Sequence, residues 1–306
     1  MYLKPQENSM RAASDKLPVT VVIPTKNEAA NLPRCLSALG RFSEVVVVDS
    51  GSTDDTVKIA RGAGATVLTF KWDGHFPKKR NWCLQTHRFR TEWVLFLDAD
   101  ERVTAEFVRE LERSVARAEY HAYWVKYDNY FMGKLLKHGD RMKKMALLRL
   151  GSGQFEPVDE DHWSTLDMEV HEHLLVDGKV GRMKSSIVHD DDKGLRAYYD
   201  RHNCYSSWEA SRTLAVAGRN SPAGLTFRQR LKYRLARSMW FPVAYFFAAY
   251  VLKFGFLDGA AGLRFNLSKM FYFYQINFKI AELESGGEKK GRAPAEGGAA
   301  QNSRAS

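Results

Sequence analysis

Apolar and polar positions alternate between two periods along the first hundred residues. Four short apolar runs have the composition of buried strands, namely VTVVIP (19–24), EVVVVDS (44–50), TVLTF (66–70) and WVLFLDAD (93–100). The segments between them, 28–39, 52–64 and 78–88, are predicted helices, and the first repeats apolar residues at helical spacing. This alternation predicts βαβ units, and therefore an α/β fold with a Rossmann-like, mainly parallel sheet flanked by helices.

Polar residues gather directly after three of the predicted strands. They are Thr25–Glu28 after the first, Asp49–Ser52 after the second and Asp98–Asp100 after the fourth. In sheets of this kind ligands bind beyond the carboxyl ends of the strands. These segments are therefore the predicted ligand site.

Asp98 and Asp100 stand one residue apart at the end of a strand that is predicted to be buried. Two carboxylates repel each other when exposed, and when buried together they need a cation or a shared proton. Their oxygens suit Mg²⁺ or Mn²⁺, which would also hold a substrate's phosphates and neutralise a departing diphosphate. The alternative is a solvated loop with two incidental acids, but the preceding strand and the other strand-end acids favour the metal.

Two further groups have both a structural and a functional interpretation. Asp49 could cap the helix that follows it, or accept hydrogen bonds from a nucleobase or ribose. Lys78, Lys79 and Arg80 could form a solvated face. They also stand at the start of a predicted helix, where cations oppose the helix dipole, so a nearby anionic ligand would explain them better.

Four segments in this order, VVIPTKNEAANLPRCLSAL, EVVVVDSGSTDDTVKIA, KKRN and WVLFLDADE, resemble the family 2 inverting glycosyltransferases of the GT-A fold. The longer pattern DSGSTDDT…WDGHFPKKRNWCL…LDADE is most similar to the branch that contains lipopolysaccharide-core β-glucosyltransferases and related exopolysaccharide enzymes. The resemblance covers residues 17 to 285.

This resemblance implies roles for the strand-end residues. Asp49 would contact the base, Asp98 would face the ribose or sugar, and Asp100 would ligate the metal. His189, in SSIVHDDD, would be a second metal ligand, although a lone histidine is usually structural. The other residues implied to bind the nucleotide sugar are Pro24, Thr25, Asn27, Glu28, Ser50, Lys79, Arg80, Asn81 and Ala99.

An inverting transfer needs one general base, which takes the proton of the acceptor hydroxyl. The segment EVHEHLLVDG offers candidates, and strand alternation would place Glu169, His171 and His173 on one face and Glu172 on the other. The resemblance favours Glu172 as the base, with Glu169 and Asp159 as alternatives. Glu172 could instead be a surface or ion-paired residue.

The chain changes character near residue 225. Several cations between 228 and 237 precede an apolar run, 239–252, which is shorter than the roughly 20 residues of a transmembrane helix. A second segment, 265–280, is rich in aromatic residues, which favour the head-group level. This pattern is typical of an interfacial or re-entrant membrane element. The alternative is a pair of core helices packed on the catalytic domain or on a second subunit.

These patterns divide the chain into a flexible N-terminus (1–16), a GT-A catalytic domain (17–224), a membrane-associated helical region (225–284) and a disordered tail (285–306). The net charge of +10 favours anionic partners such as nucleotides or an anionic membrane surface. The three cysteines show no disulfide or zinc pattern, and the N-terminal residues lack the apolar core of a secretory signal. We therefore expect a location on the cytoplasmic face of the bacterial inner membrane.

The sequence thus predicts a metal-dependent inverting glycosyltransferase with Mg²⁺ or Mn²⁺ as cofactor. It would move a hexose, with UDP-glucose as the expected donor, to a lipid-linked saccharide acceptor. One alternative is a sugar nucleotidyltransferase, although no Gly-rich phosphate loop follows the first strand. Another is a non-catalytic membrane adaptor on a transferase fold. The arginines stand beside apolar helices rather than between stacking aromatics, which argues against nucleic-acid binding. Self-association is left open.

Overall fold

The computed structural model describes residues 16–157, 172–217 and 227–290. The alternative bases Asp159 and Glu169 lie outside the described residues. So do residues 1–15 of the predicted flexible N-terminus and residues 291–306 of the predicted tail.

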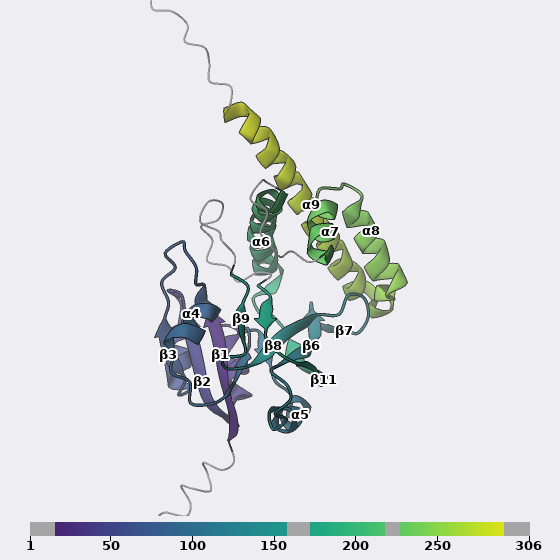
Figure 1. The fold of residues 1–306 in the computed structure, drawn as a ribbon. Coiled ribbons are helices and arrows are strands. Elements are labelled where there is room, and N and C mark those ends of the chain that lie inside the picture. The colour runs from purple at the N-terminus through teal and green to yellow at the C-terminus, as the bar shows by residue number, and fades with distance from the viewer. Residues whose placement is uncertain (1–15, 158–171, 218–226, 291–306) are drawn as a thin grey trace, which may run out of the picture.

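A nine-stranded sheet forms the centre of the fold, with the order β3-β2-β1-β4-β8-β6-β11-β5 and with β7 paired to β6 (Figure 1). Its strands are β1 (Leu17–Thr25), β2 (Phe42–Asp49), β3 (Thr66–Thr69), β4 (Trp93–Phe96), β5 (Glu101–Arg102), β6 (Ala122–Phe131), β7 (Lys134–Leu136), β8 (Lys143–Arg149) and β11 (Val180–His189). A separate antiparallel pair is formed by β9 (Gly153–Phe155) and β10 (Leu174–Val176).

The first half of the sheet is parallel and the second half is mixed. β3, β2, β1 and β4 run parallel to one another, as the βαβ pattern predicts. Beyond β4, β8 is antiparallel to both of its neighbours, while β6 and β11 are parallel to each other. The predicted α/β class with its Rossmann-like sheet is confirmed.

Helices flank the sheet and continue as a C-terminal helical unit. They are α2 (Leu32–Ser37), α3 (Thr56–Gly62), α4 (Lys79–Thr86), α5 (Ala105–Val115), α6 (Gly194–Ala217), α7 (Phe227–Ala236), α8 (Phe241–Phe247), the π-helix η1 (Ala248–Leu252), the 3-10 helix η2 (Gly255–Asp258) and α9 (Gly259–Lys290). The last of these runs past residue 285, where the sequence predicted a disordered tail to begin. That prediction was wrong for residues 285–290, because an established helix extends one residue at a time at little further entropic cost.

The helix predicted over 28–39 is confined to α2. The backbone N–H groups of the residues before it donate hydrogen bonds to side chains that follow β2, instead of taking part in a helical turn. Asn27 N donates to Ser52 Oγ at 2.8 Å and Glu28 N donates to Thr56 Oγ1 at 2.7 Å. Pro33 then stands in the first turn of α2, where its missing N–H costs nothing. This loop-to-loop contact brings the ends of β1 and β2 together.

The core has two apolar layers, one on each face of the sheet. One layer packs Val21, Ile23 and Leu95 against α2, α3 and α5. The other packs Val22, Val94 and neighbouring residues against α4 and the β9–β10 pair. Because successive strand residues point to opposite faces, β1 contributes to both layers. Two covered faces leave the carboxyl edge of the parallel strands as the open side for chemistry.

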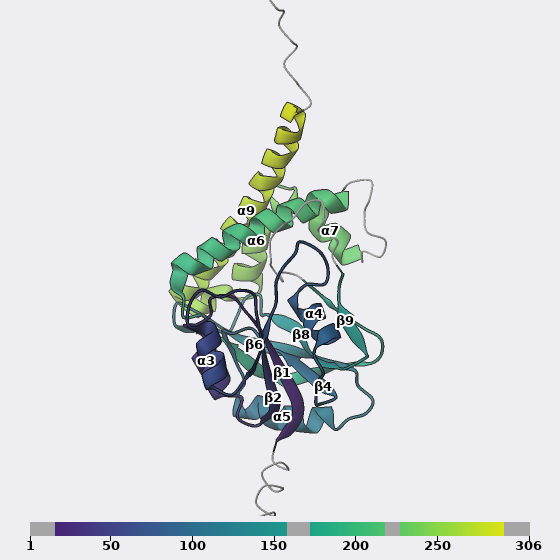
Figure 2. The same ribbon diagram turned by 90° about the vertical axis from the view of Figure 1, so that its left-hand side faces the viewer.

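The C-terminal helices lie beyond that carboxyl edge. In Figures 1 and 2 β1 runs upward from the lower end of the sheet, and α6 crosses above the upper ends of the strands. α9 packs along α6 through Tyr272, Ile276 and Ile280, which are buried with Ala210. One side of α9 is therefore core, as the packing alternative predicted, while α8 to η2 lie away from α6 (Figure 1).

No single helix in the described part of the chain has the length and apolar composition of a membrane span. One pair of helical segments, Phe241–Leu252 and Gly255–Gly286, meets these criteria when taken together, but it is bent by 73° at the break between them.

The junction of η2 and α9 generates a stability prediction. A Cβ at Gly262 would lie 2.3 Å from the carbonyl oxygen of Gly255 and 2.8 Å from Cβ of Asp258, so there is no room for it. We expect Gly262→Ala to lower the free energy of unfolding by about 1–3 kcal/mol through overpacking. Gly286→Ala, in the same helix with nothing within 4 Å, is the matched control. It should stabilise by up to about 1 kcal/mol because alanine favours helix. Urea denaturation measures both, and equal effects would contradict the close contact.

Candidate active site

Asp98, at the end of β4, lies between two cations. Its Oδ1 accepts a hydrogen bond from Arg80 at 2.9 Å, and its Oδ2 accepts one from Lys144 Nζ at 2.5 Å. Burial alone would raise the pKa of Asp98, but the charges of Lys144 and Arg80 outweigh burial and hold it below its usual range. The sequence argument had assigned charge neutralisation at this acid pair to a metal. At Asp98, two protein cations already supply this neutralisation, so its carboxylate is stable there without a metal.

Glu101 completes this charge cluster and was missed by the sequence analysis. Its Oε1 accepts from Lys144 Nζ at 2.7 Å, while its Oε2 accepts from the backbone N–H of Asp98 at 3.0 Å. Burial raises the pKa of Glu101 to about 7, with Lys144 opposing the rise. The segment LDADE carries the one available signal, because an acid three residues after Asp98 can reach back across a turn.

Asp100 points to the neighbouring strand end, where it meets His189. Asp100 Oδ2 lies 3.4 Å from His189 Nε2, and β11 pairs with β5 so that His189 is opposite Glu101. Burial opposes charge on both groups. Each nevertheless favours the charged form of the other, so the pKa of Asp100 is lowered and that of His189 is raised. The two predicted metal ligands, 89 positions apart by number, are thus neighbours in space.

The donor chemistry of this pair fits a divalent cation in part. Asp100 offers a hard carboxylate oxygen, the ligand type that suits Mg²⁺ and Mn²⁺, and His189 offers an imidazole, which suits transition metals. The buried Nδ1 of His189 has no hydrogen-bond partner among the described residues. No group of three or more His, Cys, Asp or Glu residues within the described ranges could hold a metal ion. A cation here would therefore depend on a substrate for further ligands.

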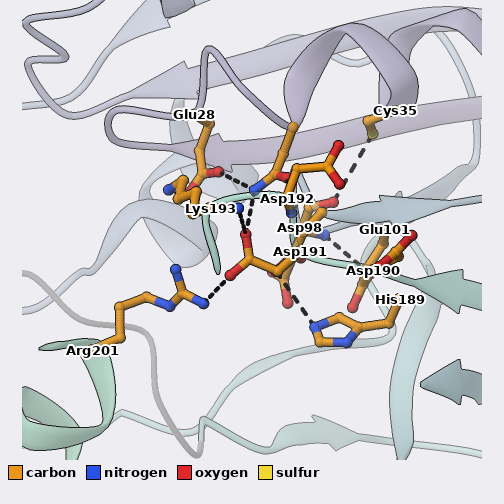
Figure 3. A network of polar contacts seen from close by, with 12 residues as sticks. Glu28, Cys35, Asp98, Glu101, His189, Asp190, Asp191, Asp192, Lys193 and Arg201 are labelled. Atoms are coloured by element: carbon orange, nitrogen blue, oxygen red, sulfur yellow. Dashed lines mark hydrogen bonds and ion pairs between the residues drawn. The ribbon is translucent and has the colours of Figure 1, made fainter. Parts of the chain in front are cut away.

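The loop after His189 is tied to both sides of the site (Figure 3). Asp191 accepts from Asn31, next to α2, at 2.8 Å and pairs with Arg201 of α6. Lys193 Nζ contacts Glu28 Oε1 at 2.5 Å. Arg34 of α2 bonds to the backbone oxygen of Asp190 at 2.8 Å. This network fixes the strand end that carries His189 and connects it to α6.

Glu28 and Asn27, predicted to line the nucleotide pocket, are at the same edge of the sheet. Burial raises the pKa of Glu28, with its Lys193 contact opposing the rise. Asn27 adopts a left-handed backbone conformation (φ 57°), and its Oδ1 accepts from Thr53 N at 2.8 Å. Asparagine tolerates that conformation better than most residues.

Asp49 is fully occupied by its own loop. Its Oδ2 accepts from the N–H groups of Gly51 and Ser52 at 3.0 and 2.9 Å. Its Oδ1 accepts from Thr25 Oγ1 at 3.1 Å and from Ser52 Oγ at 2.5 Å. These contacts shape the turn after β2. Asp49 does not cap α3 as the structural alternative predicted, because Asp54 supplies the side-chain contact to Thr56 N there.

The basic segment at α4 also has protein partners. Lys78 Nζ lies over the rings of Trp72 and Trp208, at 5.6 and 5.7 Å. Lys79 Nζ donates to Ser50 Oγ at 2.9 Å, and Arg80 pairs with Asp98. These protein contacts account for the three cations without a ligand, so the expectation of a nearby anion stays a prediction. Lys79 and Arg80 still bridge the ends of β2 and β4, as expected for a site at this edge.

Asn81 is a structural residue in its contacts. Its side-chain amide donates to the Phe155 carbonyl at 3.0 Å and accepts from Phe155 N at 2.9 Å, fully buried. These two hydrogen bonds hold β9 onto α4, and the role of Asn81 beside the donor sugar stays a prediction. Pro24 and Ala99 also take part through packing: Pro24 pairs with Val48 in the sheet, and Ala99 is buried.

Glu172 lies two residues before β10, outside the strand that the sequence predicted to contain it. Its Oε2 is buried. The next residue, His173, contacts Glu156 through its ring at 3.3 Å, and Glu156 pairs with Arg212 of α6 at 3.2 Å. The segment that carries the predicted base is therefore fixed between β9 and α6.

Comparisons with known proteins identify the family of the chain. The family model "Glycosyl transferase family 2" matches residues 20–175. An uncharacterized glycosyltransferase of Rickettsia typhi is 30% identical over 257 residues, covering 79% of this chain and 80% of that protein. The lipopolysaccharide core biosynthesis glycosyltransferase LpsC of Rhizobium meliloti is 27% identical over 204 residues, covering 64% of this chain and 71% of that protein.

Solved structures give a weaker likeness. The crystal structure of S. aureus TarS 1-349 is 14% identical, with a TM-score of 0.39, and the match covers 88% of this chain and 91% of that chain. A likeness of that size carries no argument about the site.

The charge cluster generates a stability prediction at Lys144. Lys144→Met leaves Glu101 without its cation and Asp98 with Arg80 alone. We expect the free energy of unfolding to fall by about 2 kcal/mol, less than the roughly 3–5 kcal/mol of a fully buried pair because the ammonium group is partly exposed. The matched control is Lys143→Met, an exposed neighbour on the same strand, which should change stability by less than about 0.5 kcal/mol. Equal losses in urea denaturation would contradict the cluster.

Proposed function

This chain belongs to glycosyl transferase family 2, and we propose that it transfers a hexose from a nucleotide-diphosphate sugar to a saccharide acceptor with inversion at the anomeric carbon. The observation that carries the proposal is the meeting of Asp100 and His189 at the carboxyl edge of the sheet, beside the neutralised Asp98. That is where parallel sheets of this kind bind ligands. The enzyme class follows from the family, and the donor and acceptor are proposals.

The proposed donor is UDP-glucose and the proposed acceptor is a lipid-linked saccharide of lipopolysaccharide or exopolysaccharide synthesis. The likeness to LpsC, whose name states lipopolysaccharide core biosynthesis, supports this class of acceptor. We further propose that the nucleotide lies along the ends of β1 and β2. There Asp49 acts mainly through the turn that it holds, and Lys79 adds positive charge.

Asp100 and His189 are the proposed holders of Mg²⁺ or Mn²⁺, with the donor diphosphate supplying further ligands. When bound, the cation would neutralise the charge of the diphosphate. Arg80 and Lys144 keep Asp98 ionised and in place, so that it can accept hydrogen bonds from the donor's ribose or sugar. The loop from Asp190 to Lys193 keeps the His189 strand end in register with Asp100.

Glu172 is the proposed general base. Its carboxylate takes the proton of an acceptor hydroxyl while the hydroxyl oxygen forms a bond to the anomeric carbon. The bond from that carbon to the diphosphate oxygen breaks on the opposite face, and the nucleoside diphosphate leaves with the electron pair. Because its segment is already fixed, the base loses less conformational entropy when the transition state forms.

The metal proposal predicts the behaviour of Asp100→Ala. We expect nucleotide release to fall by more than about 100-fold with every nucleotide sugar tested, the scale seen when one charge-stabilising group is removed. Mn²⁺ binding in the presence of UDP, followed by electron paramagnetic resonance, should weaken in parallel. Glu119→Gln, a surface acid paired with Lys179, is the control that leaves both unchanged. Near wild-type release and Mn²⁺ binding by the Asp100 variant would exclude the metal site.

Pyrophosphate instead of UDP as product would favour the nucleotidyltransferase alternative.

The base proposal predicts a different pattern for Glu172→Gln. Donor affinity, measured by calorimetry with UDP, should stay within about twofold because the variant keeps size and polarity. Transfer to acceptor should fall by about 10²–10⁴-fold, the usual contribution of a general base. Normal transfer by this variant would move the base to Glu169 or Asp159.

A further inference from the structure

We propose that an apolar surface at the end of the C-terminal helical unit docks into the interfacial layer of an anionic lipid bilayer. We name it the apolar tip and define it as Val251, Leu252, Phe254, Phe256 and Leu257, between η1 and α9. The proposal stands on the surface itself. It rests on the proposed function only for its purpose, which is to bring the active site to a lipid-linked acceptor.

The apolar tip is exposed to a degree that a soluble fold does not need. Leu252 is 63% exposed, Leu257 57% and Phe254 56%. The exposed face continues along α8 through Phe247 (53%) and on to Trp240 (79%). Single exposed apolar residues are ordinary, but a contiguous run of large ones indicates an interaction site.

The backbone at the tip adds an independent observation. Phe254 has φ 59°, in the left-handed region that glycine adopts without steric cost. The turn between β6 and β7 repeats the arrangement, since Met132 has φ 51° and is 52% exposed. More than half of each side chain remains exposed. Two large apolar residues therefore occupy strained positions where glycine would serve folding better, which indicates a role outside the fold.

The apolar tip is rigidly held on its inner side. Asp258 accepts hydrogen bonds from the N–H groups of Lys137 and His138 at 3.1 and 2.9 Å, and from His138 Nδ1 at 3.0 Å. Gly139 N donates to the Lys253 carbonyl at 2.9 Å. These contacts fasten the tip to the loop after β7. Since β7 pairs with β6 in the central sheet, the tip is fixed relative to the candidate active site.

A lipid bilayer fits this surface better than a second copy of the chain. Exposed cations lie within the tip or on the segments next to it, namely Lys134, Lys137, Lys253 and Arg264, of which Lys253 is paired with Asp140 at 2.7 Å. Cations beside aromatic and aliphatic side chains match an anionic head-group layer above an acyl boundary, whereas two copies would bring like charges together. The 73° bend between Phe241–Leu252 and Gly255–Gly286, with α9 packed on α6, fits shallow insertion rather than a span.

Phe254→Gly tests the proposal without threatening the fold, because glycine prefers this backbone conformation. The full chain is floated with vesicles of phosphatidylcholine containing phosphatidylglycerol, and with vesicles of phosphatidylcholine alone. Wild-type protein should bind the anionic vesicles and lose binding at high salt. Phe254→Gly should weaken that binding by at least about tenfold, the scale of burying one aromatic side chain, while thermal stability is kept or raised. Leu252→Ser should act in the same direction.

Leu175→Ser is the matched control, since Leu175 is 50% exposed on β10, away from the tip. It should leave vesicle binding unchanged. Equal binding by wild type and Phe254→Gly would overturn the proposal. So would a concentration-dependent dimer that needs Phe254 while wild type ignores vesicles, since the surface then belongs to a second copy. Equal binding to neutral vesicles would overturn the requirement for anionic lipid. UDP release by Phe254→Gly is a separate readout, so failure here leaves the transferase assignment untouched.

Discussion

The carboxylate of Asp98 lies between Arg80 and Lys144, and the geometry of the whole strand end follows from that pairing. Because these two cations balance its negative charge, Asp98 can remain ionised in a partly buried position. Its backbone then closes a turn with Glu101, whose own carboxylate bonds back to Asp98 N and to Lys144. The turn directs Asp100 toward β11. A buried charge without these partners would relax toward water or neutralise itself, and the position of Asp100 would be lost.

The same constraint passes to the helices through His189. Its strand pairs with β6 on one side and with the two-residue β5 on the other. The His189 ring therefore lies opposite the turn Asp98–Glu101, which we call the acid turn. The residues that follow are bound to α2 and α6 by ion pairs, including Asp191 with Arg201. α6 also holds the Glu172 segment through Arg212 and Glu156. Asp100, His189 and the segment carrying the predicted base are thus positioned by one set of contacts.

Local patterns in the sequence predicted the parallel half of the sheet and the edge at which the polar residues meet, because period and strand ends are local properties. They missed Lys144, which comes from an antiparallel strand 46 positions after Asp98. They also overestimated α2, since the N–H groups of residues 27–29 are used by side chains of a loop far along the chain. For Asp49 and Asn81 the residue type indicated a hydrogen-bonding role, but the sequence did not indicate which group each side chain would bond to. A carboxylate or amide at a strand end can serve the backbone as readily as a ligand, and only tertiary contacts decide which.

One strand links the candidate active site with the apolar tip. β6 places Asn129 opposite His189 and then turns through Met132 and Gly133 into β7, whose following loop is bonded by Asp258 of η2. Every step of this connection is a backbone pairing, a tight turn or a part-buried hydrogen bond, so it contains no long unstructured linker. If the tip enters the head-group layer, the height of the acid turn above the bilayer is set by the fold. An acceptor carried on a lipid would then meet the site at a fixed level, which reduces the search to motion in the plane of the membrane. The strained backbone at Phe254 and Met132 is consistent with this membrane-facing role, because a fold that had only to be stable would place glycine at these positions.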